Sequence, residues 1–174
     1  MNAKRRALFL DRDGVINVDH GYVYTPECTE FIDGIFDVCR MAKDYDYLVV
    51  VITNQAGIAR GYYSERDFLI YMEWMAEQFL NNHAKIDAVY FCPHHPSEGK
   101  GAYLQECDCR KPAPGMILQA QCELNIDLAS SVLIGDKASD LQAGKSAGVG
   151  SCLLVDSNML PTRKIIESYL VQPN

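Results

Sequence analysis

The stretch that decides the fold is Ala7-Leu8-Phe9-Leu10, followed at once by Asp11-Arg12-Asp13-Gly14. A short apolar run such as 7–10 is typical of a buried strand. Asp11 and Asp13 would then lie where the strand leaves its sheet, at the edge where open α/β sheets bind ligands. Two carboxylates this close suit a division of roles between a nucleophile or metal ligand and a proton donor. The plainer alternative is a solvated turn, since Asp and Gly are common turn residues.

Apolar strands and amphipathic helices alternate along the rest of the chain. A Gly-bracketed loop is expected at 56–61, and Ser64 with Asp67 forms a capping box at the start of a long helix. Such alternation predicts a Rossmann-like, doubly wound parallel α/β sheet with helices on both faces and right-handed crossovers. We expect residues 1–174 to form one domain. The further expected strands are 47–52, 86–91, 131–134 and 151–155, and the expected helices are 35–45, 64–80, 116–124, one ending at 147, and 161–170.

Composition limits the class of protein. At 174 residues and 48% hydrophobic, the chain has the size and apolar content of one domain with an ample core. The formal charge of -7 argues against a nucleic-acid or membrane partner, which would need a basic face. Seven cysteines without a secretion signal favour reduced thiols, and possible metal binding, over a disulfide framework. We therefore expect a cytoplasmic protein, and we expect it to be a monomer.

Residues 92–109 differ in composition from the rest of the chain and show neither helical nor strand periodicity. Long loops without structure of their own are uncommon unless they are functional or held by something. Cys92-x-His94 and Cys107-x-Cys109 together supply the Cys3His set that tetrahedral zinc accepts. The alternative is that these are reduced cysteines packed as small apolar residues. Their polar, proline-rich surroundings favour a closed, structural zinc site, and we call residues 92–109 the zinc loop.

The expected strand ends can be compared with one another. In a parallel sheet Asp11, Asp13, Thr53 and Asp136 all emerge at the same edge, and Lys111 enters from the loop before a crossover helix. A hard dication such as Mg²⁺ prefers carboxylates, which Asp11 and Asp136 supply, while Thr53 and Lys111 suit phosphate oxygens. No expected strand is followed by a G-x-G-x-x-G sequence, and no Walker loop is present. The set predicts phosphoryl transfer.

These motifs resemble the four ordered motifs of the haloacid dehalogenase superfamily of phosphatases, and the resemblance spans essentially the whole chain. More narrowly, four longer stretches are similar to the D-glycero-D-manno-heptose 1,7-bisphosphate 7-phosphatases. They are Asn17-Val18-Asp19-His20-Gly21-Tyr22, Thr53-Asn54-Gln55-Ala56-Gly57-Ile58-Ala59-Arg60-Gly61, Cys92-Pro93-His94-His95-Pro96 and Cys107-Asp108-Cys109-Arg110-Lys111-Pro112. The resemblance implies a compact fold without a separate cap domain.

The resemblance also implies roles for individual residues. Asp11 would be the nucleophile that forms an aspartyl-phosphate, and Asp13 would be the general acid and base. Mg²⁺ would be bound by Asp11, the backbone carbonyl of Asp13 and Asp136, and Thr53 and Lys111 would stabilise the transferring phosphoryl group. The family's zinc ligands fall on the four residues already named, Cys92, His94, Cys107 and Cys109. The implied substrate-binding residues are Asp19, His20, Gly21, Tyr22, Asn54, Gln55, Arg110 and Lys137.

The implied activity is removal of the 7-phosphate from a heptose bisphosphate, a step in the synthesis of lipopolysaccharide core precursors. A related phosphatase acting on histidinol phosphate, or on another small sugar phosphate, is the alternative enzyme. A zinc-stabilised binding module without activity is a third reading, and it would require that Asp11 or Asp13 be lost. Both are present. The sequence leaves open which anomer is preferred at the first carbon of the sugar.

Overall fold

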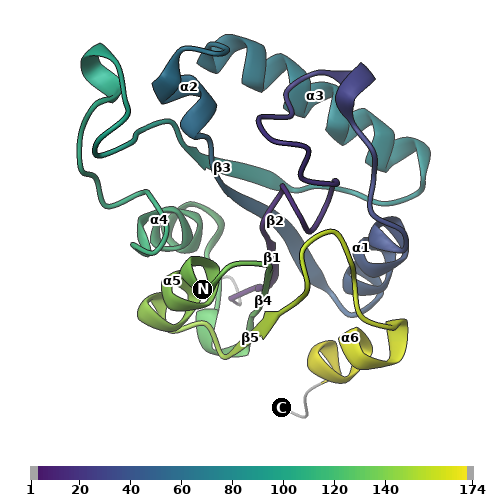
Figure 1. Cartoon of the computed structure of the whole chain (residues 1–174). Coiled ribbons are helices and arrows are strands. Elements are labelled where there is room, and N and C mark those ends of the chain that lie inside the picture. The colour runs from purple at the N-terminus through teal and green to yellow at the C-terminus, as the bar shows by residue number, and fades with distance from the viewer. Residues whose placement is uncertain (1–3, 172–174) are drawn as a thin grey trace.

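The computed structural model describes residues 4–171, which contain a five-stranded parallel sheet in the order β3-β2-β1-β4-β5 (Figure 1). The predicted fold class is confirmed. Relative to the predicted strands, β2 extends two residues further, to Asn54, and β3 begins at Ala88 rather than at 86. The strands are β1 (Arg6–Leu10), β2 (Tyr47–Asn54), β3 (Ala88–Cys92), β4 (Val132–Gly135) and β5 (Ser151–Leu154).

Helices cover both faces of this sheet. One apolar cluster joins one face to α1, α3 and α6, and a second joins the opposite face to α4 and α5 (Figure 1). All elements pack on the single sheet, so no separate cap domain is present in residues 4–171. The assignment of 1–174 to one domain stays a prediction, and its first and last three residues lie outside the described range. The longer helices are α1 (Ile35–Asp44), α3 (Glu65–Asn81), α4 (Gly115–Leu124), α5 (Ala138–Ala147) and α6 (Arg163–Leu170).

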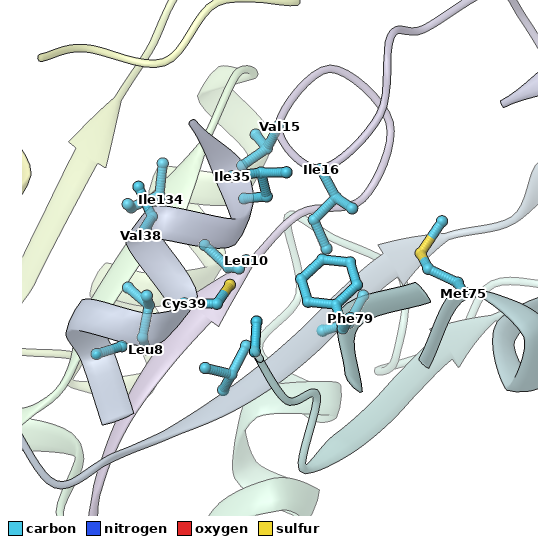
Figure 2. Packing of buried hydrophobic residues seen from close by; sticks show 14 of the residues in the cluster. Leu8, Leu10, Val15, Ile16, Ile35, Val38, Cys39, Met75, Phe79 and Ile134 are labelled. Atoms are coloured by element: carbon cyan, nitrogen blue, oxygen red, sulfur yellow. The ribbon is translucent and has the colours of Figure 1, made fainter. Parts of the chain in front are cut away.

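The strand 7–10 is fully buried because alternate side chains enter the two opposite clusters. Leu8 and Leu10 pack with Ile35 and Val38 of α1, as Figure 2 shows, while Ala7 and Phe9 face α4 and α5. A strand covered on both faces needs no polar alternation, which explains the continuous apolar run. The core therefore fixes the position at which Asp11 leaves the sheet.

The prediction of a loop at 56–61 is wrong. Ala56–Arg60 is a short helix, α2, and Gly61 ends it in a left-handed conformation at φ 77°. The helix is stabilised by tertiary packing rather than by propensity: a Cβ on Gly57 would lie 2.3 Å from the ring of Tyr63. Two glycines in a short segment suggested a loop, but one of them permits this close approach and the other ends the helix.

The predicted capping box is confirmed at the start of α3. The Ser64 side chain accepts a hydrogen bond from the Asp67 backbone N–H at 3.1 Å, and the Asp67 carboxylate accepts one from the Ser64 backbone N–H at 2.9 Å. Trp74, in the middle of this helix, stacks on Tyr71 and Phe31 and contributes to the core as expected. In the part of the chain that the structure describes, no helix has both the length and the apolar content needed to cross a membrane.

Candidate active site and metal centre

The ends of β1, β2 and β4 lie side by side at one edge of the sheet. Because β1 pairs with both neighbours, Leu10 stands opposite Val51 and Ile134, and the residues that follow each strand face the same space. The Asp11 backbone N–H donates to the carbonyl oxygen of Ile134 at 3.1 Å, which continues the strand pairing into the site. The edge is therefore built on the central strand of the sheet and its two neighbours.

Lys111 lies at the centre of this edge and is almost completely buried. Its ammonium group is 2.7 Å from a carboxylate oxygen of Asp11, 2.7 Å from one of Asp140, and donates to the carbonyl of Ile52 at 2.9 Å. The other oxygen of Asp140 accepts from the backbone N–H of Lys137, at the start of α5. Lys111 thus orients the Asp11 carboxylate and places a positive charge beside it.

Burial and charge act in opposite directions on this pair. Burial raises the pKa of Asp11 to about 7, although the positive charge of Lys111 acts to lower it. Burial alone would lower the pKa of Lys111, but the negative charges of Asp11 and Asp140 outweigh it and raise that pKa. The lysine is therefore held in its charged form, and a cation beside Asp11 would favour the carboxylate.

Asp136 supplies an observation that fits a metal ion. Both of its carboxylate oxygens are buried and have no hydrogen-bond partner among the described residues. Carboxylate oxygens of Asp11, Asp136 and Asp140 lie within 4.8 Å of one another, and we call these three residues the aspartate cluster. A Cβ on Gly14, which has φ +93°, would lie 2.3 Å from Asp136, so glycine leaves room here. An acceptor set of this kind suits a hard dication such as Mg²⁺.

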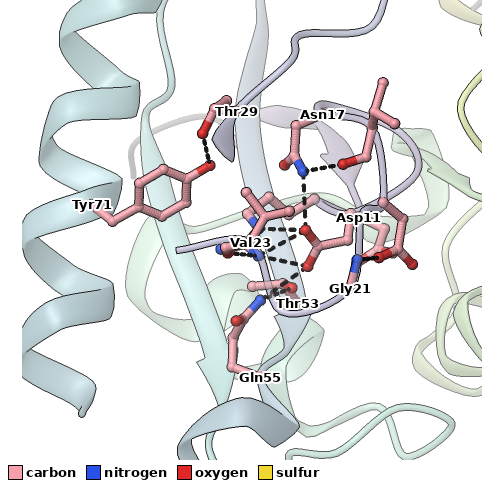
Figure 3. Close-up of polar contacts among 12 residues, drawn as sticks. Asp11, Asn17, Gly21, Val23, Thr29, Thr53, Gln55 and Tyr71 are labelled. Carbon is pink, nitrogen blue, oxygen red and sulfur yellow. Dashed lines mark hydrogen bonds and ion pairs between the residues drawn. The ribbon is translucent and has the colours of Figure 1, made fainter. Parts of the chain in front are cut away.

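Asp13 is not a member of the aspartate cluster, and its carboxylate is held by a separate polar network. Arg12 Nη2 donates to both Asp13 carboxylate oxygens at 2.7 Å, and Asn17 Nδ2 donates to Oδ1 at 3.1 Å. Gln55 Nε2 lies 2.8 Å from Thr53 Oγ1 and 3.4 Å from Asp13 Oδ2, and Asn17, Thr53 and Gln55 are labelled in Figure 3. These contacts hold the Asp13 carboxylate in one orientation beside the cavity that Asp13 lines.

Arg12 is fully buried, which is unusual for an arginine. Its guanidinium lies 5.5 Å from the ring centre of Phe68 and 5.2 Å from that of Tyr71, and donates to the carbonyl of Val23 at 2.6 Å. The aromatic faces and the Asp13 carboxylate compensate for its desolvation. Through Arg12, the aromatic residues of α3 thereby help to fix the carboxylate of Asp13.

A cavity of about 460 Å³ opens above this edge. Most of the predicted substrate-binding residues line it, but His20 does not: its ring nitrogen Nε2 lies 3.3 Å from Glu30 on the exposed surface. Lys137 Nζ is 3.5 Å from the Asp19 carboxylate. Residues 19–22, which we call the substrate loop, therefore contact the residue that follows Asp136. The lining residues are Asp13, Asp19, Gly21, Tyr22, Asn54, Gln55, Ala56, Gly57, Tyr63, Arg110, Lys111, Lys137 and Ser139.

The second cluster consists of Cys92, His94, Cys107 and Cys109, which we call the cysteine cluster. The three sulfur atoms are 3.2 to 3.5 Å apart, and His94 Nδ1 lies 3.5 Å from the sulfur of Cys109 and 3.9 Å from that of Cys92. With metal–sulfur distances of about 2.3 Å, a tetrahedral zinc would hold such atoms slightly less than 4 Å apart. The spacing and the donor set therefore fit a closed zinc site.

Arg110 and Lys111, which follow the cysteine cluster in sequence, are held by two sets of hydrogen bonds. Arg110 Nη1 donates to the carbonyl of His94 at 3.1 Å. The Asn54 side chain accepts from the Lys111 backbone N–H and donates to the Lys111 carbonyl, both at 3.0 Å. The residues after Cys109 are thus held by the zinc loop on one side and by the end of β2 on the other.

Sequence reasoning did not identify four residues that hold the site residues in place. They are Arg12, Asn17, Tyr63 and Asp140. Asp140 is the last residue of the motif Gly135-Asp136-Lys137-x-x-Asp140, to which sequence reasoning assigned no role, and it is the third residue of α5. Its contact with Lys111 spans two distant segments. The other three act through contacts with residues that neither periodicity nor spacing identifies.

Comparisons with known proteins agree with the geometry. A HAD-hydrolase-like family model matches residues 108–164. The chain is 57% identical over 152 residues to the D-glycero-alpha-D-manno-heptose-1,7-bisphosphate 7-phosphatase of Burkholderia mallei, covering 87% of this chain and 80% of the relative. It is 52% identical over 149 residues to the D-glycero-beta-D-manno-heptose-1,7-bisphosphate 7-phosphatase of Vibrio cholerae, covering 86% and 80%.

Solved structures show the same similarity. The D,D-heptose 1,7-bisphosphate phosphatase of B. bronchiseptica, complexed with magnesium and phosphate, is 33% identical with a TM-score of 0.74, covering 84% of this chain and 78% of that one. A HAD-like phosphatase candidate from Mesorhizobium loti is also 33% identical, with a TM-score of 0.87 and coverage of 97% and 86%.

Proposed function

Because the chain belongs to the D-glycero-D-manno-heptose-1,7-bisphosphate 7-phosphatase family of HAD-like phosphatases, we propose that it removes the 7-phosphate of this sugar bisphosphate. The observation that carries the proposal is the buried edge where Asp11, Asp136 and Lys111 meet beneath a cavity lined by further cations. Arg110 and Lys137 both line that cavity, which suits a substrate with more than one phosphate.

In this proposal Asp11 attacks phosphorus through a carboxylate oxygen, and the bond between phosphorus and the sugar oxygen breaks. The product of the step is an aspartyl-phosphate, which water then hydrolyses to restore the carboxylate. Lys111 holds the attacking carboxylate and offsets the negative charge of the phosphoryl oxygens. The hydroxyl of Thr53, fixed by Gln55, supplies a further polar contact at the same edge.

Asp13 is proposed as the general acid and base. It protonates the departing sugar oxygen in the first step, and it takes a proton from water in the second. Its contacts with Arg12, Asn17 and Gln55 hold the carboxylate in one orientation, as proton transfer requires.

Two metal ions complete the proposal. Mg²⁺ would be held by Asp11, Asp136 and the backbone carbonyl of Asp13, and when bound it would neutralise phosphate charge during the transfer. Asp140 is assigned to Lys111 rather than to the metal, because both of its oxygens already have partners. Zn²⁺ would be held by the cysteine cluster, where three sulfurs and one ring nitrogen complete a tetrahedron.

The roles of the cavity residues follow from their chemistry. The planar guanidinium of Arg110 suits the phosphate that is not cleaved, while Asp19, Gly21 and Tyr22 form a wall toward the sugar. Asn54, Gln55 and Lys137 also line the cavity and are proposed to contact the substrate. His20 is better explained as a surface residue beside Glu30.

The test is a side-by-side assay of turnover on both anomers of the heptose bisphosphate and on histidinol phosphate. We expect kcat/KM to be highest for one of the two bisphosphate anomers, and lower for histidinol phosphate. The named relatives act on the alpha anomer in one case and on the beta anomer in another, so the assay also decides the anomer. Faster turnover of histidinol phosphate would contradict the proposed substrate, and no turnover at all would contradict the activity.

A further inference from the structure

Arg60, the last residue of α2, connects two segments that the mechanism above treats separately. Its Nη2 forms an ion pair with the Glu98 carboxylate, in the zinc loop. Its guanidinium carbon lies 5.8 Å from the ring centre of Tyr22, in the substrate loop. The same guanidinium therefore contacts Glu98 of the zinc loop and Tyr22, which lines the cavity.

Glu98 is itself fixed to the zinc loop. Its carboxylate lies 3.6 Å from His95 Nε2, and its backbone N–H donates to His95 Nδ1 at 3.0 Å. His95 directly follows the cluster residue His94. The Lys100 backbone N–H also donates to the Ala59 carbonyl at 2.9 Å, so the tip of the zinc loop is bonded to α2. The position of Arg60 consequently depends on the zinc loop.

The Tyr22 ring also contacts Tyr62, whose ring lies edge-on to it with the ring centres 4.8 Å apart. The Tyr22 backbone is left-handed, at φ 54°, an uncommon conformation for a residue with a side chain. Such conformations persist where the surroundings impose them, and they concentrate at ligand sites. Although Tyr22 lines the cavity, its side chain is partly exposed, so packing into the core does not hold it.

We propose that Arg60 is a positioning residue, which holds the Tyr22 ring at the mouth of the cavity against the sugar, while Glu98 of the zinc loop holds Arg60. The Tyr22 ring offers an apolar face to the C–H groups of a sugar and a hydroxyl to its oxygens. The inference rests on the proposed function for the identity of the substrate. It assigns to the zinc loop a part in sugar recognition through Arg60, separate from its link to the phosphate through Arg110.

A surface ion pair alone predicts little change on mutation, because exposed pairs contribute little to stability. The inference predicts a different pattern, in which the loss falls on the sugar substrate. The experiment compares Arg60→Met with Arg40→Met, a control arginine that pairs with Asp37 on α1. Each variant is assayed on the heptose bisphosphate and on acetyl phosphate, which carries a phosphoryl group and no sugar.

For Arg60→Met we expect the ratio of kcat/KM on the heptose bisphosphate to that on acetyl phosphate to fall about tenfold, mainly through KM. Arg60→Lys, which keeps the charge for Glu98 but lacks the planar guanidinium, should fall in between. Arg40→Met should keep the wild-type ratio. If Arg60→Met also keeps it, the inference is overturned.

A second comparison tests whether Arg60 acts through Tyr22. Tyr22→Leu should lower the ratio, and adding Arg60→Met should lower it by no more than about twofold further, because the two changes remove one contact. If the loss in the double variant equals the product of the two single losses, Arg60 acts independently of Tyr22, which contradicts the inference.

Amide hydrogen exchange provides a readout that does not depend on the substrate. Arg60→Met should speed exchange of amides 20–24 several-fold, while Arg40→Met should not. Unchanged exchange overturns the holding role, and faster exchange with an unchanged ratio overturns the role in recognition. If the wild-type enzyme prefers another phosphate ester, the proposed function fails, and the exchange result still decides whether Arg60 holds Tyr22.

Discussion

The aspartate cluster and the cysteine cluster both gather metal-binding side chains, but different parts of the fold position them. The aspartates follow β1 and β4 or lie in the first turn of α5, and a buried lysine supplies a positive charge among them. In the cysteine cluster only Cys92 belongs to a strand, and the other three residues lie in loop segments.

The difference teaches what each cluster requires in order to form. Strand pairing and the ion pairs of Lys111 hold the aspartates through contacts within the chain, so substitutions there should change chemistry more than folding. Burial raises the pKa of the Cys92 thiol, and the proposed zinc would favour the thiolate and hold this loop. Substitutions in the cysteine cluster should therefore affect stability first and activity as a consequence.

The largest expected effect is that of Asp11→Asn in the aspartate cluster. Turnover should fall more than about 10³-fold, because a carboxamide is a poor nucleophile and a weaker metal ligand. The variant should remain folded, since Lys111 still pairs with Asp140. Steady-state kinetics and circular dichroism measure the two quantities. Activity above about a tenth of wild type would remove Asp11 from its proposed role.

Asp13→Asn tests the proton donor beside the same edge. General acid–base catalysis is worth about 10²–10⁴-fold, and we expect a loss in this range on a sugar phosphate, whose leaving group needs a proton. With p-nitrophenyl phosphate, whose leaving group needs little protonation, the transfer step should be less affected. Pre-steady-state release of nitrophenol measures that step. A near wild-type rate on the sugar phosphate would contradict the assignment.

The cysteine cluster is tested with the double variant Cys107→Ser/Cys109→Ser. It should lose zinc and at least about 3 kcal/mol of unfolding free energy. Displacement of the backbone at Arg110 and Lys111 should cost activity on the order of 10²-fold, even with saturating magnesium. Elemental analysis, denaturant unfolding and kinetics are the measurements.

Cys122→Ser is the matched control, since Cys122 is exposed on α4 and outside the cluster. It should retain the metal and the stability of the wild type. If zinc-free wild-type protein is as stable and as active as the zinc-bound form, the proposal that the metal holds the cysteine cluster is wrong.

Arg110→Ala probes the residue that lies between the two clusters. The loss of a charge-assisted contact with the uncleaved phosphate should lower kcat/KM for the bisphosphate by about 2 kcal/mol, or about 30-fold. A sugar monophosphate lacks that second phosphate and should be affected much less. Arg110→Lys should recover part of the loss. Equal losses on both substrates would mean that Arg110 acts on the zinc loop and not on the substrate.

The smallest expected effect lies outside both clusters, in Ser64→Ala at the start of α3. Loss of the cap should cost typically about 1 kcal/mol of stability, with kcat unchanged. Hydrogen bonds from the Ser64 side chain and backbone lower the pKa of Asp67. This contribution is present above the unfolded-state pKa and is lost as pH falls through the folded-state pKa. Urea unfolding should thus show the wild type and the variant converging in acid, and a constant difference would contradict this account.

Much of the arrangement follows from local properties of the chain. Apolar runs such as 47–52 have few alternatives to a buried strand, and they locate Thr53 at its end. Because the strands run parallel, the carboxyl ends of separate strands then meet at one edge of the sheet. The cysteine cluster could likewise be anticipated, because only a few residue types bind zinc and they occur here in two close pairs.

Other features depend on contacts between segments distant in the sequence. Helix α2 forms because Gly57 packs closely against Tyr63, and propensity alone favoured a loop. The position of His20, outside the cavity that its neighbours line, follows from the shape of one turn and not from residue type.

The sequence by itself determined the alternation of strands and helices, the residues at the strand ends and the composition of the two clusters. Burial of apolar side chains and metal-ligand chemistry depend mainly on residue type and spacing. The tertiary structure alone decided that Arg12 enters the core behind Asp13, that Asp140 reaches Lys111, and that Arg60 lies between Glu98 and Tyr22. Such contacts depend on side-chain directions and on distances across the folded chain, which no local pattern encodes.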